Sequence, residues 1–238
     1  MTGEREGALH ALEQRLGYRF ADLALLDRAL THASLANETA ARHHGDNEAL
    51  EFLGDAVLGM VVTDLLHRRD PDGAEGAKSR RRARLVSEPS LARRAADLGL
   101  PDLLLLGRGE EKTGGREKAA LWANAYEALV AALYLDGGFE AAHRFVRADF
   151  ARDFEIPDEE LEDPKSRLQE LLQGEGRPVP RYGVVEEVGP SHRRRFRVEC
   201  RLDDGTVTSG EGYSKKEAQQ QAAREALAVL RGAASEPE

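Results

Sequence analysis

The spacing of apolar residues divides the chain into two unlike parts. Up to about residue 155 the apolar residues recur at helical intervals, and breaks that contain Gly or Pro separate the periodic segments. Helices are expected over residues 22–30, 47–69, 76–86, 88–98, 118–135 and 139–153. No β-hairpin signal interrupts them, so the first part is predicted to be an all-α domain.

The second part has the alternating pattern of strands between two helical segments. Its alternating runs are rich in Val, Phe and Tyr, and the turn Asp203-Asp204-Gly205 separates two of them. The expected elements are a helix over 164–175, strands over 181–188, 193–202 and 206–212, and a helix over 215–231. This α-β-β-β-α order predicts a small α+β domain.

An acidic segment bounded by Pro157 and Pro164 is the expected linker between the two parts. The predicted organisation is a first domain over 1–155, a linker over 156–162, a second domain over 163–233 and a tail over 234–238. The net charge of −9 argues at first against a nucleic-acid partner. The second domain nevertheless contains 13 Lys and Arg against 11 Asp and Glu, whereas the first contains 21 against 26. The second domain is therefore mildly basic, and the overall charge does not exclude a polyanion.

The composition excludes several other classes of protein. Cys200 is the only cysteine, which excludes a disulfide framework and a cysteine-based zinc site. No apolar run approaches the ~20 residues that span a bilayer, and the charged N-terminal stretch lacks a hydrophobic signal segment. These features predict a soluble, cytoplasmic protein without membrane contact.

Residues 47–58, NEALEFLGDAVL, carry the strongest chemical signal of the chain. Glu48, Glu51 and Asp55 stand at i, i+3 and i+7, so they share one stripe of a helix that is otherwise apolar. Neighbouring carboxylates repel one another, and a divalent metal ion is the usual means of neutralising them. The alternative is a solvated polar face, but no Lys or Arg occurs along this helix up to residue 67.

A second apolar helix offers matching oxygen ligands at Asn124 and Glu127, again i and i+3. Oxygen ligands favour Mg²⁺ or Mn²⁺ over zinc. The alternative is that Asn124 caps or hydrogen-bonds within a helix bundle and that Glu127 pairs with an arginine. Gly54, in the middle of the first helix, costs about 0.5–1 kcal/mol relative to Ala, which suggests that another segment approaches closely there.

Other residues of the first part are weaker candidates. Glu75 lies in a Gly-flanked loop and is either a ligand or a surface acid, and Glu38 is expected to be a surface acid. His32 is a possible ligand, but a hydrogen-bonded structural histidine is expected. His43 and His44 are interpreted as polar loop residues.

The order of these motifs resembles a known family. NEALEFLGDAVL is similar to the signature of bacterial ribonuclease III, and around it stand LTHASLANE (30–38), EGAKSRRRARLVSE (75–88) and LGRGEEKTGGREK (106–118) in the family's order. The second domain resembles a double-stranded RNA-binding domain, which follows the catalytic domain in that family. The resemblance covers about residues 9–231.

The resemblance implies a homodimeric, all-α catalytic domain with the ribonuclease III endonuclease fold. Such a domain hydrolyses double-stranded RNA with Mg²⁺, for which Mn²⁺ can substitute, and leaves 5′-phosphate and 3′-hydroxyl ends. The positions implied are metal ligands at Glu51, Asp55, Asn124 and Glu127, with catalysis assigned to Asp55 and Glu127, assisting acids at Glu48 and Glu75, and a dimer-interface residue at Phe52. The family's usual residue at position 124 is Asp. The Asn124 amide brings no charge, so it is expected to weaken metal binding.

Duplex RNA is read through its shape, its 2′-hydroxyls and its phosphates, and three elements of the second domain suit that task. The predicted contacts are Ser166, Gln169 and Glu170 on the first helix, His192 in the loop between the first two strands, and Lys215 and Lys216 at the start of the last helix. Lysines in a first helical turn oppose the helix dipole unless phosphate binds there. Further candidate contacts are residues 114–118, Arg80–Arg84 and Arg193–Arg195.

The leading interpretation is a Mg²⁺-dependent endoribonuclease that processes ribosomal RNA precursors and other structured transcripts. The alternative is a catalytically weakened or inactive relative that binds double-stranded RNA, and Asn124 is the one feature that favours it. A nucleotide pyrophosphohydrolase with acid-rich helices is a third possibility. The attached RNA-binding domain argues against it, because a mononucleotide enzyme has no use for such a domain.

Overall fold

The computed structural model describes residues 2–38, 45–156, 163–189 and 194–233. The chain forms two compact units, Met1–Ile156 and Pro157–Glu238. Each unit has its own hydrophobic core. Among the described residues, no helix is both long enough and apolar enough to cross a bilayer.

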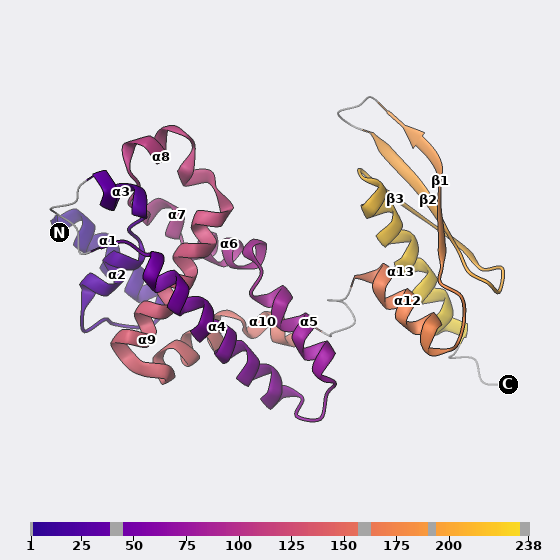
Figure 1. Ribbon diagram of the computed structural model, residues 1–238, viewed down its shortest axis with the longest axis horizontal. Helices are drawn as coiled ribbons and strands as arrows, with labels where there is room; N and C mark the ends of the chain where they lie inside the picture. The colour runs from indigo at the N-terminus through magenta and orange to yellow at the C-terminus, as the bar shows by residue number, and fades with distance from the viewer. Residues whose placement is uncertain (1, 39–44, 157–162, 190–193, 234–238) are drawn as a thin grey trace. The chain divides into compact units, whose positions relative to one another are not determined.

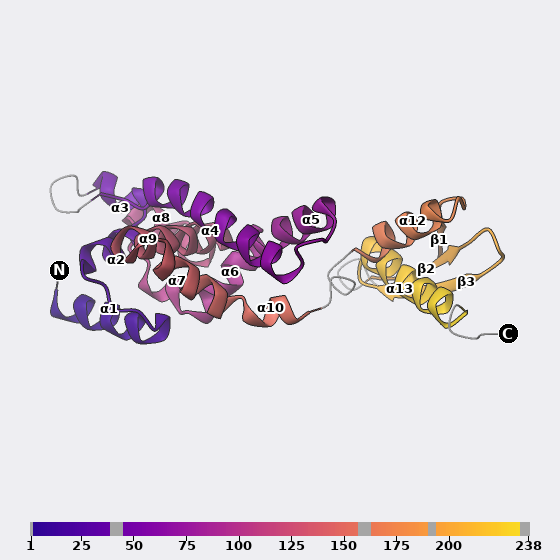
Figure 2. The same ribbon diagram turned by 90° about the horizontal axis from the view of Figure 1, so that it is seen from below.

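The first unit is helical, as the sequence predicts (Figures 1 and 2). Its elements are α1 (Gly3–Leu16), α2 (Leu23–Ala29), α3 (Ala33–Glu38), α4 (Glu48–Arg69), α5 (Glu75–Leu85), α6 (Glu88–Asp97), α7 (Leu100–Leu103), α8 (Arg108–Lys112), the 3-10 turn η1 (Gly115–Glu117), α9 (Ala119–Asp149) and α10 (Ala151–Glu155). In the described part of this unit, the strand-like pairing is one isolated bridge between Thr31 and Leu105.

Helices α4 and α9 form the centre of this unit because both are apolar on the faces that meet. The buried residues of α4 recur every three or four positions and include Leu50, Val57, Leu58, Val61 and Leu66. Helix α9 buries a run of small and branched residues from Ala125 to Leu133. Small side chains on one helix allow the backbone of the other to approach closely.

Helix boundaries differ from the predicted ones where the chain bends or where a helix is polar. The break expected between the helices at 118–135 and 139–153 is confirmed: α9 is interrupted at Gly138, whose φ of 73° and ψ of −176° are not helical and are accessible mainly to glycine. No helix was expected before residue 22, yet α1 buries Leu9, Leu12 and Leu16 against the core. The short helices α3, α7 and α8 also lack a periodic signal, because each spans six residues or fewer.

The end of the first unit is fastened by two buried arginines. Arg81 of α5 donates to the carbonyl oxygens of Asp153 and Ile156, at 2.7 and 2.9 Å. Burial lowers the pKa of Arg81 to about 10. Arg94 of α6 pairs with Asp149 at 2.9 Å and also with Asp153. Helix α10 is therefore held to α5 and α6 through side chains distant in sequence.

The second unit has the predicted α-β-β-β-α order. Its elements are α12 (Pro164–Gly174), β1 (Arg181–Val188), β2 (Arg195–Arg201), β3 (Val207–Gly212) and α13 (Lys215–Ala233). The strands form an antiparallel sheet in the order β1-β2-β3, with a bulge in β1 near Val185. Gly205, at a φ of 87°, completes the turn between β2 and β3. Both helices lie on one face of this sheet (Figure 1).

Helix α13 packs on the sheet where β3 lacks side chains. A Cβ at Gly210 would stand 2.3 Å from the Ala222 backbone nitrogen, and one at Gly212 would stand 2.7 Å from that of Ala218. Ala218, Ala222 and Ala226 are fully buried along this contact, as their four-residue spacing predicts. The close approach holds the start of α13 against the end of β3.

Candidate active site and RNA-binding face

The predicted acidic site is assembled from the two central helices of the first unit. Helix α4 contributes Glu48, Glu51 and Asp55, and helix α9 contributes Asn124 and Glu127. The two backbones touch at this level: a Cβ at Gly54 would lie 1.9 Å from the carbonyl oxygen of Glu127. The close approach inferred from the cost of a mid-helix glycine is therefore confirmed. It brings the predicted residues of the two helices near one another.

The electrostatics of Glu127 show how strongly the acids interact. Burial, together with the charges of Asp55 and Glu51, raises the pKa of Glu127 to about 7. No cation among the described residues contributes to offset this shift. A carboxylate that titrates near neutrality in a half-buried cluster lacks a partner of opposite charge. The alternative that Glu127 pairs with an arginine does not hold.

Asn124 and His32 moderate the same cluster. Burial and the charge of Glu48 raise the pKa of Glu51, while the charge of His32 and a hydrogen bond from the Asn124 side chain lower it. Because an ionised carboxylate only accepts hydrogen bonds, the Asn124 amide group is the donor. Asn124 thus hydrogen-bonds inside the bundle, as one interpretation expected, and its partner is a predicted ligand.

The donor set suits a hard divalent cation. Glu51, Asp55 and Glu127 offer carboxylate oxygens from two helices, and their charges raise the pKa of Glu127 without an opposing cation. In the part of the chain that the structure describes, no three or more His, Cys, Asp or Glu side chains are yet close enough to hold a metal ion. The carboxylates of Glu51, Asp55 and Glu127 repel one another, as the raised pKa of Glu127 records.

Other predicted residues lie outside this cluster. Glu75 is the first residue of α5 and not a loop residue; it is exposed and accepts a bond from Ser79 at 3.4 Å. No described contact joins it to the cluster. Glu38 is exposed, but it caps α8 by accepting from the backbone nitrogens of Arg108 and Gly109, at 3.1 and 3.2 Å. His43 and His44 lie outside the described residues.

His32 is the hydrogen-bonded structural histidine that was expected. Its Nδ1 lies 2.9 Å from Ser34 Oγ and accepts from the Ser34 backbone nitrogen at 3.2 Å. Its charge nevertheless reaches Glu51, and it also lowers the pKa of Glu110. The sequence offered no signal for this proximity, because it depends on a tertiary contact: the backbone nitrogen of Asn47, just before α4, donates to the Thr31 carbonyl at 2.9 Å.

Two arginines that were interpreted as RNA contacts or solvated charges, Arg81 and Arg116, instead bond to the backbone of other segments. Arg81 is buried against α10, as described above. Arg116 of the 114–118 loop donates to the carbonyl oxygens of Pro101 and Leu104, at 2.6 and 3.1 Å. Lys118 pairs with Glu110 at 2.6 Å. The sequence around these basic residues does not indicate which distant carbonyl groups their side chains will bond.

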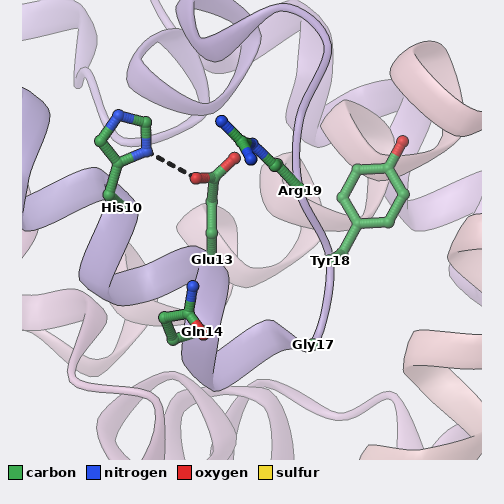
Figure 3. Close-up of a pocket in the computed structure, with 6 residues that line it drawn as sticks. All are labelled: His10, Glu13, Gln14, Gly17, Tyr18 and Arg19. Atoms are coloured by element: carbon green, nitrogen blue, oxygen red, sulfur yellow. Dashed lines mark hydrogen bonds and ion pairs between the residues drawn. The ribbon is translucent and has the colours of Figure 1, made fainter.

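Two hollows in the first unit differ in their relation to the site. A groove of about 800 Å³ begins at Asp55 and follows α4 past Gly59, Met60 and Thr63, with α5 as its other wall. A pocket of about 560 Å³ at the end of α1 is lined by His10, Glu13, Gln14, Gly17, Tyr18 and Arg19 (Figure 3). None of the predicted site residues lines that second pocket. Of these two hollows, the groove beside Asp55 is the one that adjoins the acidic site.

In the second unit the predicted contact residues are exposed on two neighbouring elements. Ser166, Gln169 and Glu170 are exposed on α12, and Lys215 and Lys216 are exposed in the first turn of α13. The two helix starts are linked directly, since Lys165 Nζ donates to Gln219 Oε1 at 2.6 Å. His192 and Arg193 lie outside the described residues.

The first turn of α13 is capped as its sequence predicts. The Glu217 backbone nitrogen donates to Ser214 Oγ at 3.1 Å. The Glu217 carboxylate accepts from the Tyr213 backbone nitrogen at 2.8 Å, one residue before the N-cap. Lys215 Nζ stands 5.6 Å from the centre of the Phe196 ring. Arg194 and Arg195 are engaged locally, with Glu187 and Tyr213 respectively.

Comparison with known proteins identifies both units. Residues 22–154 match a family model described as ribonuclease-III-like, and residues 164–230 match the double-stranded RNA binding motif. The chain is 47% identical to ribonuclease 3 of Bdellovibrio bacteriovorus over 91% of its length and 94% of that protein. It is 48% identical to ribonuclease 3 of Alkalilimnicola ehrlichii, covering 92% and 95% of the two chains.

A solved structure gives the same result for the first unit. The nuclease domain of ribonuclease III from Campylobacter jejuni aligns with a TM-score of 0.55 and 42% identity, covering 61% of this chain and 97% of that one. A helical nuclease unit joined to a duplex-RNA-binding unit defines an endoribonuclease of double-stranded RNA. The chain belongs to the ribonuclease III family. That family depends generally on divalent metal ions.

Proposed function

We propose that this endoribonuclease uses Mg²⁺ held by Glu51, Asp55, Asn124 and Glu127. The observation that carries the proposal is the close contact of α4 and α9 at Gly54 and Glu127, and the neighbouring carboxylates and burial raise the pKa of Glu127 to about 7 without a compensating cation. A bound pair of divalent cations would supply an activated water and charge stabilisation for the leaving 3′-oxygen. All four side chains offer oxygen, which suits Mg²⁺ and also Mn²⁺.

The residues of the site have distinct tasks in this proposal. The catalytic carboxylates are those of Asp55 and Glu127. Asp55 lies at the mouth of the groove on α4, and Glu127 lies on α9. Asn124 holds the Glu51 carboxylate in place through its amide. Glu48 and Glu75 are assisting acids, and the support for Glu48 is its charge beside Glu51.

Asp55→Asn tests the assignment because it removes one charge and keeps the size of the side chain. We expect cleavage of a long duplex RNA to fall by at least about 10³-fold in Mg²⁺, since a metal ligand and its charge are lost together. Binding of the same RNA in chelator is expected to stay within about twofold, because the phosphate contacts lie elsewhere. Cleavage at the parental rate would remove Asp55 from the mechanism.

We also propose that two copies of the first unit associate along α4. Phe52 and Met60 are 83% and 62% exposed on this helix, unusually high for large apolar side chains. Phe52 lies one turn before Ala56, so it continues the groove that Ala56, Gly59 and Met60 line. The solved nuclease domain of the Campylobacter jejuni enzyme is itself described as flexible in a region involved in dimer formation.

Phe52→Glu tests the interface by placing a charge where an apolar surface would be buried. We expect the parent to sediment as a dimer and the variant as a monomer with unchanged helical content. The control is Leu135→Glu, a change at a half-exposed apolar residue elsewhere on the unit. A variant that dimerises like the parent would exclude Phe52 from the contact.

The second unit is proposed to bind duplex RNA through Ser166, Gln169, Glu170, Lys215 and Lys216, with His192 as a further contact. Support comes from their exposure, from the link between the two helix starts, and from lysines placed at a helix N-terminus. The proposed division is 1–155 for catalysis, 156–162 for the linker, 163–233 for RNA binding and 234–238 for the tail. The proposed substrates are ribosomal RNA precursors and other structured transcripts, which places the protein in the cytoplasm.

A catalytically silent RNA-binding relative is the second candidate function, and Asn124 is the observation that favours it. The two functions separate when cleavage and binding are measured on the same purified chain in Mg²⁺, Mn²⁺ and chelator. Metal-dependent short duplex products support the enzyme. Binding without products in every metal supports the silent relative.

A further inference from the structure

A buried polar network holds α9 on a different face of the helix from the predicted metal ligands Asn124 and Glu127. Tyr126, the residue before Glu127, is fully buried, and its hydroxyl donates to Asp149 Oδ2 at 2.7 Å. Arg94 of α6 donates to the same oxygen at 2.9 Å and to the Asp149 carbonyl at 2.6 Å. The network therefore joins the first half of α9, the end of α9 after its kink, and α6.

The surroundings of the network leave little freedom for the helix to turn. The Tyr126 ring packs against Phe145 and Phe150, with ring centres 5.9 and 6.4 Å apart. The Arg94 guanidinium lies 3.3 Å from the centre of the Phe150 ring. Arg94 is only 5% exposed. A hydroxyl, a carboxylate and a guanidinium buried together are costly to separate, so the network resists rotation of α9.

Rotation of α9 is the movement to which the site is most sensitive. Tyr126 and Glu127 are about 100° apart around the helix, and Tyr126 and Asn124 about 160° apart, so both proposed ligands follow any turn of the tyrosine. With a carboxylate roughly 6 Å from the helix axis, a rotation of about 10° moves it by about 1 Å. A misplacement of that size can cost about 10²-fold in rate.

We infer that Tyr126, anchored by Asp149 and Arg94, is a positioning residue that sets the rotation of α9 and so aims Glu127 and Asn124 at Glu51 and Asp55. The inference rests on the proposed metal site. Tyr126 touches neither metal nor RNA and acts only through Glu127 and Asn124. Its hydroxyl is the group that fixes the rotation, because a phenylalanine ring at this position would still fill the core.

Tyr126→Phe in the full chain tests the inference, with Tyr18→Phe as the matched control. Tyr18 also donates to an aspartate at 2.7 Å, Asp136 at the far end of the same half of α9, and lines the pocket of Figure 3. Asp136 keeps the backbone nitrogens of Ala21 and Asp22 as donors when that hydroxyl is lost. Each variant removes one buried or half-buried hydroxyl, so a fall in Tm of a few degrees is expected from both.

The readouts are kcat and KM on duplex RNA and, separately, Mn²⁺ binding to the RNA-free protein measured by electron paramagnetic resonance. For Tyr126→Phe we expect kcat to fall about tenfold and Mn²⁺ binding to weaken several-fold, with KM unchanged. For Tyr18→Phe we expect neither change. Equal losses in both variants, or no loss in Tyr126→Phe, would overturn the inference.

Glu127→Gln, measured in parallel, keeps this outcome separate from the proposed function. If Glu127→Gln loses Mn²⁺ binding and cleavage while Tyr126→Phe does not, the metal site stands and the positioning role falls. If Glu127→Gln retains both, the proposed metal site itself is refuted.

Discussion

Replacing Asn124 by Asp adds one negative charge to a cluster that already contains four carboxylates. In the metal-free protein the change also removes the amide that donates to Glu51. Two carboxylates about 4 Å apart repel by about 4 kcal/mol at an effective dielectric constant of ~20. Because Glu51 is only half-buried, solvent screening reduces this to about 2 kcal/mol, and the lost charged hydrogen bond adds about 1 kcal/mol.

The expected cost of Asn124→Asp without metal is therefore about 3 kcal/mol, or a fall in Tm on the order of 10 °C. With metal the sign reverses, because the added charge becomes a ligand charge. Each 1.4 kcal/mol gained in binding tightens the metal site about tenfold. Ligand binding stabilises the fold in proportion to the logarithm of metal concentration over Kd, so the variant should gain more Tm than the parent at each Mg²⁺ concentration.

The assay is thermal unfolding of the full chain at about pH 8, first in chelator and then over a series of Mg²⁺ and Mn²⁺ concentrations. The control is Glu51→Gln in the Asn124→Asp background, which removes the new repulsion. It should restore most of the Tm measured in chelator, but the increase of Tm with metal concentration should be lost. A variant as stable as the parent in chelator, or with the parental metal response, would refute the view that Asn124 belongs to the cluster.

Three further variants probe the acidic cluster, the RNA-binding face and the contact between the central helices. Glu127→Gln should stabilise the metal-free protein by about 1–2 kcal/mol at pH 8 and by almost nothing at pH 5, with unfolding in chelator as the measurement. The sign follows from the pKa of Glu127, raised from 4.5 to about 7, which removes stability from the parent as pH rises across that interval. An equal gain at both pH values would contradict it. Lys215→Ala with Lys216→Ala should weaken duplex RNA binding and reduce the slope of log affinity against log salt by about 2, and an unchanged slope would exclude both lysines from the phosphate contact. Gly54→Ala should cost about 3 kcal/mol by denaturant unfolding, whereas Gly7→Ala, which meets open space in α1, should not destabilise; similar values for the two would show that α4 and α9 separate at no cost.

The local sequence pattern was sufficient to predict the helices and strands that are long and periodic. The apolar repeat of 47–69 predicts α4 to within one residue, and the strand expected at 181–188 coincides with β1. The glycine in α4 indicated a close approach because its cost in a helix has to be offset by packing. The residue pattern offered the juxtaposition of Glu51 with Glu127 only as one alternative, because no spacing rule links positions 76 residues apart, and the motif resemblance favoured it.

Local pattern failed where a residue's role depends on distant backbone. Arg81 and Arg116 are interpreted from sequence as solvated charges or RNA contacts, yet each caps carbonyl groups of another segment. Tyr126 is hidden for the same reason, because nothing near it in the chain indicates Asp149 as its partner. Glu75 was misplaced by a flanking glycine that does not interrupt the start of α5.

The contact between Gly54 and the Glu127 carbonyl has a consequence for genetic suppression. The missing side chain on one helix makes room for the backbone of a residue whose own side chain belongs to the acidic cluster. Under the proposed metal site, a compensating change elsewhere in the core can restore the yield of folded Gly54→Ala protein without restoring cleavage, because the carboxylates of the two helices stay further apart. The absence of a Cβ at position 54 is thus required both for folding and for cleavage. Revertants that recover both properties are expected to restore the glycine itself.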